Sequence, residues 1–164
     1  MAKALGLKCV SLNELALSGG LVRSGEVDVK ALRSAVLSDA EAPAVLFGHL
    51  LPYALSADDV SRVVVLRCDP SELAARLLRR GYAATKVREN VEAELIGLVS
   101  ADSVGAFGRR RVAELDTTGS APGAAARAAA RLLSGTLRSQ PTDWGSRYSS
   151  PARLASLWAR TASA

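Results

Sequence analysis

Residues 63–82 read VVVLRCDPSELAARLLRRGY, and this stretch decides the fold. It begins with an apolar run that has no polar alternation, which is typical of a strand buried on both faces of a parallel sheet. Asp69 can then cap a helix, and Pro70 suits the first helical position because its φ angle is already helical. A buried strand that leads directly into a capped helix predicts an α/β fold.

The same alternation of strand and helix extends over most of the chain. Apolar runs predict strands at residues 7–11, 43–49, 62–66 and 110–116. Capping residues and apolar side chains at helical spacing predict helices between these strands, and an alanine-rich helix over residues 121–135. The sequence therefore predicts a parallel sheet with helices on both faces.

Length and composition set limits on the class of protein. The chain has 164 residues and a formal net charge of +5 that is spread along it, so charge alone does not indicate a nucleic-acid partner. No apolar segment approaches the length that spans a bilayer, so we expect a cytoplasmic protein without a membrane partner. Ser, Thr, Pro and Arg dominate after residue 135, which predicts one domain over residues 1–135 and a loosely held extension over residues 136–164.

Four short stretches follow the predicted strands at their carboxyl ends. Their sequences are SLNEL, FGHLLP, RCDP and LDTTGS. Ligands of open parallel sheets bind beyond this end of the strands. We therefore expect the functional site where these four stretches meet.

A basic cluster flanks a short hinge after the helix that begins at Pro70. Arg79, Arg80, Lys86 and Arg88 lie on either side of residues 81–84. Arginine donates paired hydrogen bonds to phosphate oxygens and stays charged during phosphoryl transfer, so the cluster can close over an anion. The same residues also fit a solvated helix end, where basic side chains favour the helix dipole. Both interpretations stay open from these residues alone.

His49 is the one histidine of the sequence. It follows a predicted strand, where an imidazole can position a water molecule or a phosphate. A lone histidine in a turn also fits a structural or simply exposed residue, and the position alone favours that second interpretation.

Residues 63–95, VVVLRCDPSELAARLLRRGYAATKVRENVEAEL, with GHLLP before them and LDTTG after them, resemble the archaeal and eukaryotic adenylate-kinase-like proteins of the CINAP type. The resemblance covers roughly residues 1–135. It implies a P-loop nucleoside monophosphate kinase that uses ATP and Mg2+, phosphorylates AMP or a similar monophosphate, and has ATPase activity. It also implies a role in small ribosomal subunit maturation, with a small-subunit ribosomal protein and pre-rRNA as partners.

The resemblance assigns roles to particular residues. Residues 79–89 match the LID of the family, and residues 11–32 match the segment that binds the monophosphate. Arg80, which matches the position that contacts ATP, and His49, which matches the histidine of an Asp-x-His motif near the transferred phosphate, are the expected catalytic residues. The expected cofactor-binding residues are Arg79, Arg80, Lys86, Arg88, Thr118, Gly119 and Ser120, of which the last three lie where the family packs adenine. The expected substrate-binding residues are Ser11, Asn13, Glu14 and Asp28.

Two features depart from the family pattern. Phe47 stands at the aspartate position of Asp-x-His, and a phenyl ring cannot hold a metal-bound water. The glycine-rich phosphate loop does not occur in the sequence, and MAKALG, residues 1–6, matches the helix that directly follows this loop in the family. We therefore expect that the loop and the first strand, which is the middle of the family's sheet, are encoded upstream of Met1.

A non-catalytic protein is the alternative. In that case the chain would be a ribosome-assembly binding module that has lost both the phosphate loop and the aspartate of Asp-x-His.

Overall fold

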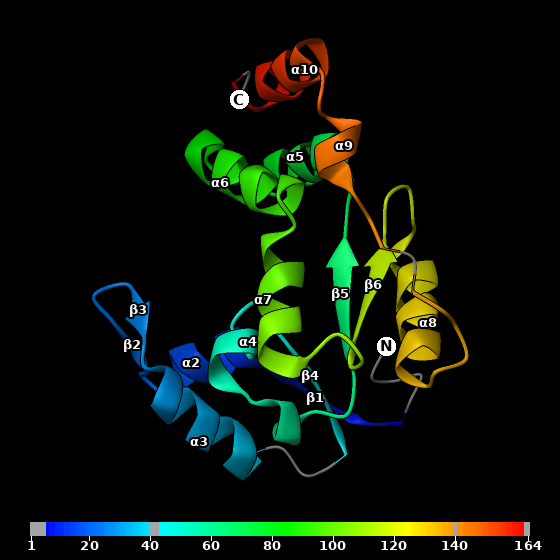
Figure 1. Ribbon diagram of the computed structural model, residues 1–164. Coiled ribbons are helices and arrows are strands. Elements are labelled where there is room, and N and C mark those ends of the chain that lie inside the picture. The colour runs from blue at the N-terminus through cyan, green and yellow to red at the C-terminus, as the bar shows by residue number, and fades with distance from the viewer. Residues whose placement is uncertain (1–5, 40–42, 140, 163–164) are drawn as a thin grey trace.

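Strands and helices alternate along the chain in the computed structural model, which describes residues 6–39, 43–139 and 141–162 (Figure 1). The strands are β1 (Lys8–Ser11), β2 (Val22–Arg23), β3 (Glu26–Val27), β4 (Ala44–Phe47), β5 (Val63–Arg67) and β6 (Val112–Asp116). The helices are α2 (Leu12–Ser18), α3 (Val29–Asp39), α4 (Leu51–Ala54), the 3-10 helix η1 (Ala57–Asp59), α5 (Pro70–Arg79), α6 (Ala84–Leu95), α7 (Leu98–Phe107), α8 (Pro122–Leu133), α9 (Trp144–Arg147) and α10 (Pro151–Ala162). Within these described ranges no helix has both the length and the apolar character needed to cross a membrane.

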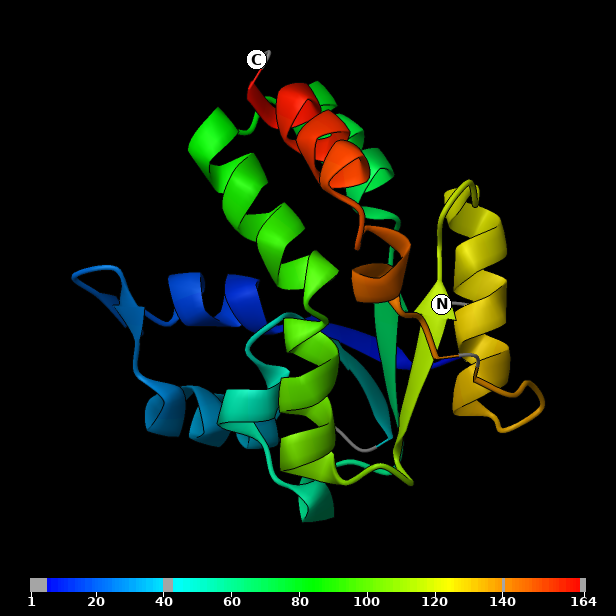
Figure 2. The same cartoon turned by 45° about the horizontal axis from the view of Figure 1, so that its top comes forward.

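Two parallel strand pairs form the centre of the molecule. β1 pairs with β4, and β5 pairs with β6. α7 and α8 pack on the β5–β6 pair from opposite sides (Figures 1 and 2). The predicted α/β class, with parallel strands flanked by helices, is confirmed.

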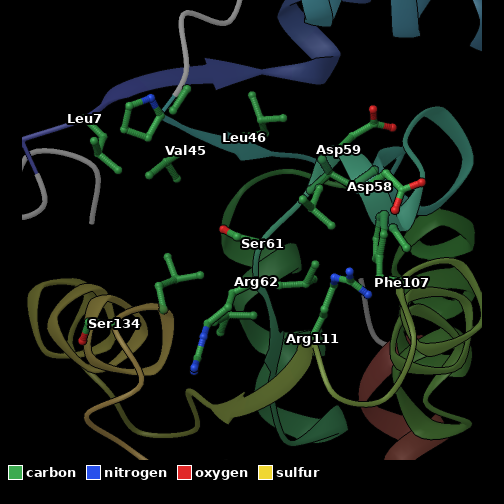
Figure 3. Close-up of a pocket in the computed structure, with 18 residues that line it drawn as sticks. Leu7, Val45, Leu46, Asp58, Asp59, Ser61, Arg62, Phe107, Arg111 and Ser134 are labelled. Carbon is green, nitrogen blue, oxygen red and sulfur yellow. The ribbon is translucent and has the colours of Figure 1, made fainter.

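The two parallel pairs are not hydrogen-bonded to each other. Among the described strands, β4 pairs with β1 alone and β5 pairs with β6 alone, so each keeps one open edge. A cavity of about 840 Å³ lies between them, and Val45 and Leu46 of β4 line it together with Val63 and Val64 of β5 (Figure 3). The open edges of β4 and β5 therefore border one common space.

Side-chain caps begin the helices where the sequence predicts them. The Ser11 hydroxyl accepts a hydrogen bond from the Glu14 N–H at 3.3 Å, and Asp28 Oδ1 accepts one from the Ala31 N–H at 3.0 Å. Asp69 Oδ1 accepts from the Ser71 N–H at 2.9 Å, directly before Pro70 opens α5. Each cap satisfies a backbone donor that has no partner inside its own helix.

The C-terminal extension differs from the loosely held segment that the sequence predicts. α10 packs on α5 and α6, and Leu157 is only 1% exposed, in a cluster with Ala74, Leu77, Val87 and Val91. The cause is the apolar stripe of α10, which places Leu157 on the same face as the half-buried Leu154 and Trp158. Polar contacts add to this packing: the Trp144 indole N–H donates to Glu94 Oε1 at 2.9 Å, and the Tyr148 hydroxyl donates to Asp69 Oδ1 at 2.8 Å.

A buried arginine connects β5 to its neighbours. The Arg67 side chain is 3% exposed and pairs with two carboxylates: its Nε donates to Glu94 of α6 at 2.7 Å, and its Nη1 donates to Glu114 of β6 at 2.9 Å. It also donates to the Thr142 carbonyl in front of α9 at 3.4 Å. Burial alone would raise the pKa of Glu114, but hydrogen bonds from Ser100 and the Thr142 N–H and the charge of Arg67 outweigh it, so the pKa is lowered.

Replacement of Arg67 by methionine tests this network. We expect Arg67→Met to lower the free energy of unfolding by about 3–5 kcal/mol at neutral pH, because it leaves two poorly solvated carboxylates without their cation. The folded-state pKa of Glu114 lies below its ordinary value of 4.5, so the wild type keeps this contribution above that pH and loses it as the pH falls. Urea unfolding at several pH values measures both effects, and the difference between the two proteins should narrow toward acid pH.

Lys86→Met is the matched control. The ion pair of Lys86 with Glu89 is exposed, so its loss should leave the urea midpoint unchanged. Equal stability of Arg67→Met and the wild type at neutral pH would contradict the role given to Arg67.

Candidate functional site

A second cavity, of about 820 Å³, lies at the carboxyl ends of β5 and β6. Arg79 and Arg80 line it from α5, and Gly119 and Ser120 line it from the loop after β6. Leu66 and three alanines of α8 add an apolar wall. The structure thus brings together two of the predicted basic residues and two of the predicted adenine-contacting residues. The basic pair and the adenine-contacting pair are at least 39 positions apart in the sequence.

The two arginines stand at the hinge end of α5. Both are exposed, and neither forms an ion pair with a described residue. Arg80 is the C-cap residue, and Gly81 follows it with φ +76, a conformation that strains residues with a side chain. Two guanidinium groups without a carboxylate partner, beside an apolar wall, suit an anionic ligand that also has an apolar part.

The loop after β6 has a fixed conformation. The Thr117 hydroxyl donates to the Arg67 carbonyl at 2.8 Å, and the Thr118 N–H donates to Asp116 Oδ1 at 2.8 Å. Thr118 Oγ1 in turn accepts from the Asp69 N–H at 2.8 Å, so Thr118 ties the loop to the start of α5 and does not line the cavity. These bonds preform one wall of the cavity before any ligand binds.

Two residues that the sequence analysis does not single out, Glu72 and Arg76, join α5 to this loop. Glu72 Oε2 accepts from the Gly119 N–H at 2.9 Å, and Arg76 donates to the Thr117 carbonyl at 2.8 Å. Glu72 and Arg76 also form an ion pair with each other. Their helical spacing from Arg79 and Arg80 places all four on neighbouring turns of α5, and this spacing is the signal that could have identified them.

Lys86 and Arg88 do not line the cavity. Lys86 pairs with Glu89 at 2.8 Å, and Arg88 pairs with Glu92 at 2.9 Å, both along α6. The Arg88 guanidinium also lies over the Trp158 ring of α10, 5.3 Å from its centroid. The described structure therefore places the basic residues before the hinge at the cavity and those after it on α6, away from the cavity.

Four of the other predicted residues, Ser11, Asn13, Glu14 and His49, lie at the carboxyl ends of β1 and β4, whereas Asp28 follows β3. Ser11 pairs in register with Phe47, and the Asn13 side chain lies beside Gly48, since a Cβ built on that glycine would be 3.6 Å from Asn13 Oδ1. His49 follows and is exposed. Ser11 and Asp28 serve as helix caps, and Glu14 contributes its N–H to the first cap.

Magnesium has no ready-made site in this region. Among the described residues, no three His, Cys, Asp or Glu side chains come together as a metal-binding group. Phe47, 47% exposed at the end of β4, presents a phenyl ring, which has no oxygen that could bind Mg2+. The described side chains therefore form no group that would hold Mg2+ here.

The α/β fold, with parallel strands flanked by helices, is consistent with the P-loop kinase type. We call the cavity lined by Arg79, Arg80, Gly119 and Ser120 the cleft. The family described as "AAA domain" matches residues 13–97. A protein of Thermococcus onnurineus named "Putative adenylate kinase" is 35% identical over 154 residues, which is 90% of this chain and 83% of the relative. Proteins of the same name from Pyrococcus furiosus and Natronomonas pharaonis are 37% and 38% identical, over 74% and 66% of this chain.

The chain therefore belongs to this P-loop kinase family. The matched region spans 67% of the Pyrococcus furiosus protein and 61% of the Natronomonas pharaonis protein.

Replacement of Glu72 tests how the cavity wall is held. We expect Glu72→Ala to accelerate hydrogen exchange of the Gly119 N–H at least about tenfold, because a hydrogen bond to a charged group contributes about 1.5–3 kcal/mol. NMR-detected exchange measures this directly. Glu89→Ala is the matched control, since Glu89 pairs with Lys86 away from the loop. Unchanged exchange at Gly119 would show that Glu72 does not hold the loop.

Proposed function

We propose that the protein is a nucleoside monophosphate kinase of the adenylate kinase type, which transfers the terminal phosphate of ATP to AMP or a similar monophosphate. One observation carries the proposal: Arg79 and Arg80 face the Gly119–Ser120 loop across a single cavity at the carboxyl ends of the strands. The names of the relatives agree with this activity.

The cavity suggests how ATP would lie. The adenine base fits against the apolar wall and the loop after β6, which supplies backbone groups at Gly119 and Ser120. Arg80, assisted by Arg79, would stabilise the negative charge that develops on the transferring phosphoryl group. Lys86 and Arg88 belong to the same LID, and their exposed ion pairs are weak enough to exchange for a phosphate when it closes.

The monophosphate would bind on the other side of the strand ends. The segment of residues 11–32 begins at the carboxyl end of β1, and His49 follows the carboxyl end of the neighbouring β4. Asn13, beside Gly48, is exposed and can contact a ligand there. His49 would position the acceptor phosphate or a hydrolytic water, which accounts for ATPase activity as a side reaction.

The phosphate-binding loop would directly follow a strand that lies between β4 and β5. An extended segment in that cavity would satisfy the open edges of both strands, and a loop after it would reach the carboxyl edge where Arg79 and Arg80 stand. P-loop kinases generally use ATP with Mg2+, whose charge assists phosphate binding.

Ribosome maturation belongs to the proposal by resemblance. In that role a cytoplasmic protein would act on the small ribosomal subunit, with a small-subunit ribosomal protein and pre-rRNA as partners. The second candidate function is a non-catalytic binding module for the same partners. Phe47 favours it, because its exposed ring stands where the family has an acidic side chain.

Arg80→Ala separates the candidate functions. We expect this change to lower turnover of ATP and AMP by about 100-fold or more, because it removes a charge that acts on the transition state. Coupled-enzyme kinetics measures turnover, and thermal unfolding should show little change since Arg80 is exposed. Arg127→Ala, an exposed arginine of α8 outside the cavity, is the control.

The outcomes have distinct meanings. Unchanged turnover in Arg80→Ala would remove Arg80 from the site. If the protein neither binds nor turns over ATP, the binding module becomes the function to pursue.

A further inference from the structure

Four arginines gather at the amino ends of β5 and β6, away from the nucleotide cleft at the carboxyl ends. Arg62 directly precedes β5, and Arg109, Arg110 and Arg111 directly precede β6. The Val63 N–H donates to the Arg111 carbonyl at 2.8 Å, so the start of one strand lies beside the start of the other. We call these four residues the amino-edge arginines.

A tight turn presents two of them to solvent. The Arg111 N–H donates to the Gly108 carbonyl at 3.1 Å, which closes a four-residue turn with Arg109 and Arg110 at its centre. Gly108 has φ +77, a conformation that glycine adopts without strain. All four amino-edge arginines are exposed.

The other two amino-edge arginines, Arg62 and Arg111, border the cavity between β4 and β5. Arg62 Nη1 donates to the Leu132 carbonyl at the end of α8 at 3.3 Å, which holds its guanidinium over that helix end. Arg111 lines the same cavity as Arg62, and Figure 3 shows both on the wall formed by β5 and β6. The positive groups therefore extend from the turn to the rim of the cavity.

No described carboxylate neutralises this cluster by an ion pair. None of the four amino-edge arginines occurs in an ion pair within the described residues, whereas Arg33, Arg67 and Arg88 each have a carboxylate partner. Asp58 lines the cavity as well, but it forms no ion pair with a described residue. Four like charges this close repel one another, and a polyanion that spans them would relieve the repulsion.

The surroundings of the cluster distinguish between polyanions. Binding to an anionic membrane surface usually adds apolar side chains that enter the headgroup region. The exposed large apolar side chains of the described chain all lie outside residues 61–63 and 107–112, where the arginines are. The planar guanidinium fork also matches phosphate oxygens, and such contacts dominate nucleic-acid backbone binding.

We propose that the amino-edge arginines bind the phosphate backbone of a nucleic acid. This surface does not depend on the kinase reaction, because it lies at the opposite end of β5 and β6 from Arg79 and Arg80; it rests on the proposed function only in that it would provide a binding surface for the nucleic-acid partner named there. Contacts to phosphates carry no base readout, so the binding is independent of sequence and weakens steeply with salt.

Fluorescence anisotropy with labelled hairpins tests the proposal on the chain itself, without nucleotide. One hairpin is RNA and a second, of the same sequence, is DNA, so that the preferred source of phosphates is identified. We expect a double variant, Arg109→Gln with Arg110→Gln, to weaken binding about tenfold and to reduce the salt slope of log Kobs by about 1.4–1.8, as expected for two lost phosphate contacts. Replacement of both by lysine should retain most of the affinity, because lysine keeps the charge.

Matched variants decide whether the site is specific. Arg127→Gln with Arg153→Gln removes the same charge from exposed positions on α8 and α10 and should leave the affinity nearly unchanged. Equal weakening by this control would overturn the proposal in favour of diffuse charge. Failure of the wild type to bind either hairpin at low salt would overturn it as well.

Polyglutamate and vesicles of anionic lipid test whether the amino-edge arginines prefer an acidic polypeptide or a membrane surface to a nucleic acid. Displacement of the hairpin by polyglutamate at equal charge concentration, or tighter binding to vesicles of anionic lipid than to either hairpin, would overturn the assignment to nucleic acid. If Arg79→Gln with Arg80→Gln abolishes hairpin binding while Arg109→Gln with Arg110→Gln leaves it unchanged, the nucleic acid binds at the cleft and the proposal is overturned. Loss of kinase activity alone would leave the hairpin result standing, so the two proposals fail separately.

Discussion

The buried guanidinium of Arg67 is the constraint on which the rest of the structure depends. A charge with 3% of its side chain exposed must be paired, since an isolated buried ion costs far more than the fold can supply. Its partners come from α6, from β6 and from the segment before α9. The described structure places these elements so that Nε, Nη1 and Nη2 of Arg67 each donate a hydrogen bond. The ion network thereby specifies an arrangement that apolar packing alone would leave less defined.

The same residue connects the extension to the candidate cleft. The side chain of Arg67 contacts the segment before α9, while its backbone carbonyl accepts hydrogen bonds from both the N–H and the hydroxyl of Thr117. Two residues further, Asp69 caps α5 and also accepts the Tyr148 hydroxyl. α5 connects Asp69 at its N-cap to Arg80 at its C-cap. The arginines of the cleft are thus positioned from the far end of their helix, by contacts that reach across much of the sequence.

Local chemistry explains which parts of the fold the sequence predicts. A capped helix after an apolar run is encoded within a few residues, so the strand–helix order, the caps at Ser11 and Asp69 and the α/β class follow from the sequence. The rule that ligands bind at the carboxyl ends of parallel strands points to the loop after β6, whereas the pairing of Arg80 with Gly119 in one site came from the family resemblance. The packed extension does not follow, because a polar composition hides the apolar stripe that Leu157 represents. Nor do the places of Lys86 and Arg88, which depend on partners within α6 and on Trp158 of a distant helix.

The open edges of β4 and β5 constrain what can occupy the space between them. Backbone groups along an edge need hydrogen-bond partners, and water can supply them, but the cavity between these strands has walls of Val45, Leu46, Val63 and Val64. Water therefore satisfies the backbone and leaves the apolar walls exposed, whereas a compact apolar ligand would cover the walls and leave the backbone unpaired. An extended polypeptide does both, because its main chain can bond to each edge while its side chains alternate toward the two faces. The shape and chemistry of the cavity thus favour a strand as the occupant, and a strand in this position would end at the edge where the candidate nucleotide cleft opens.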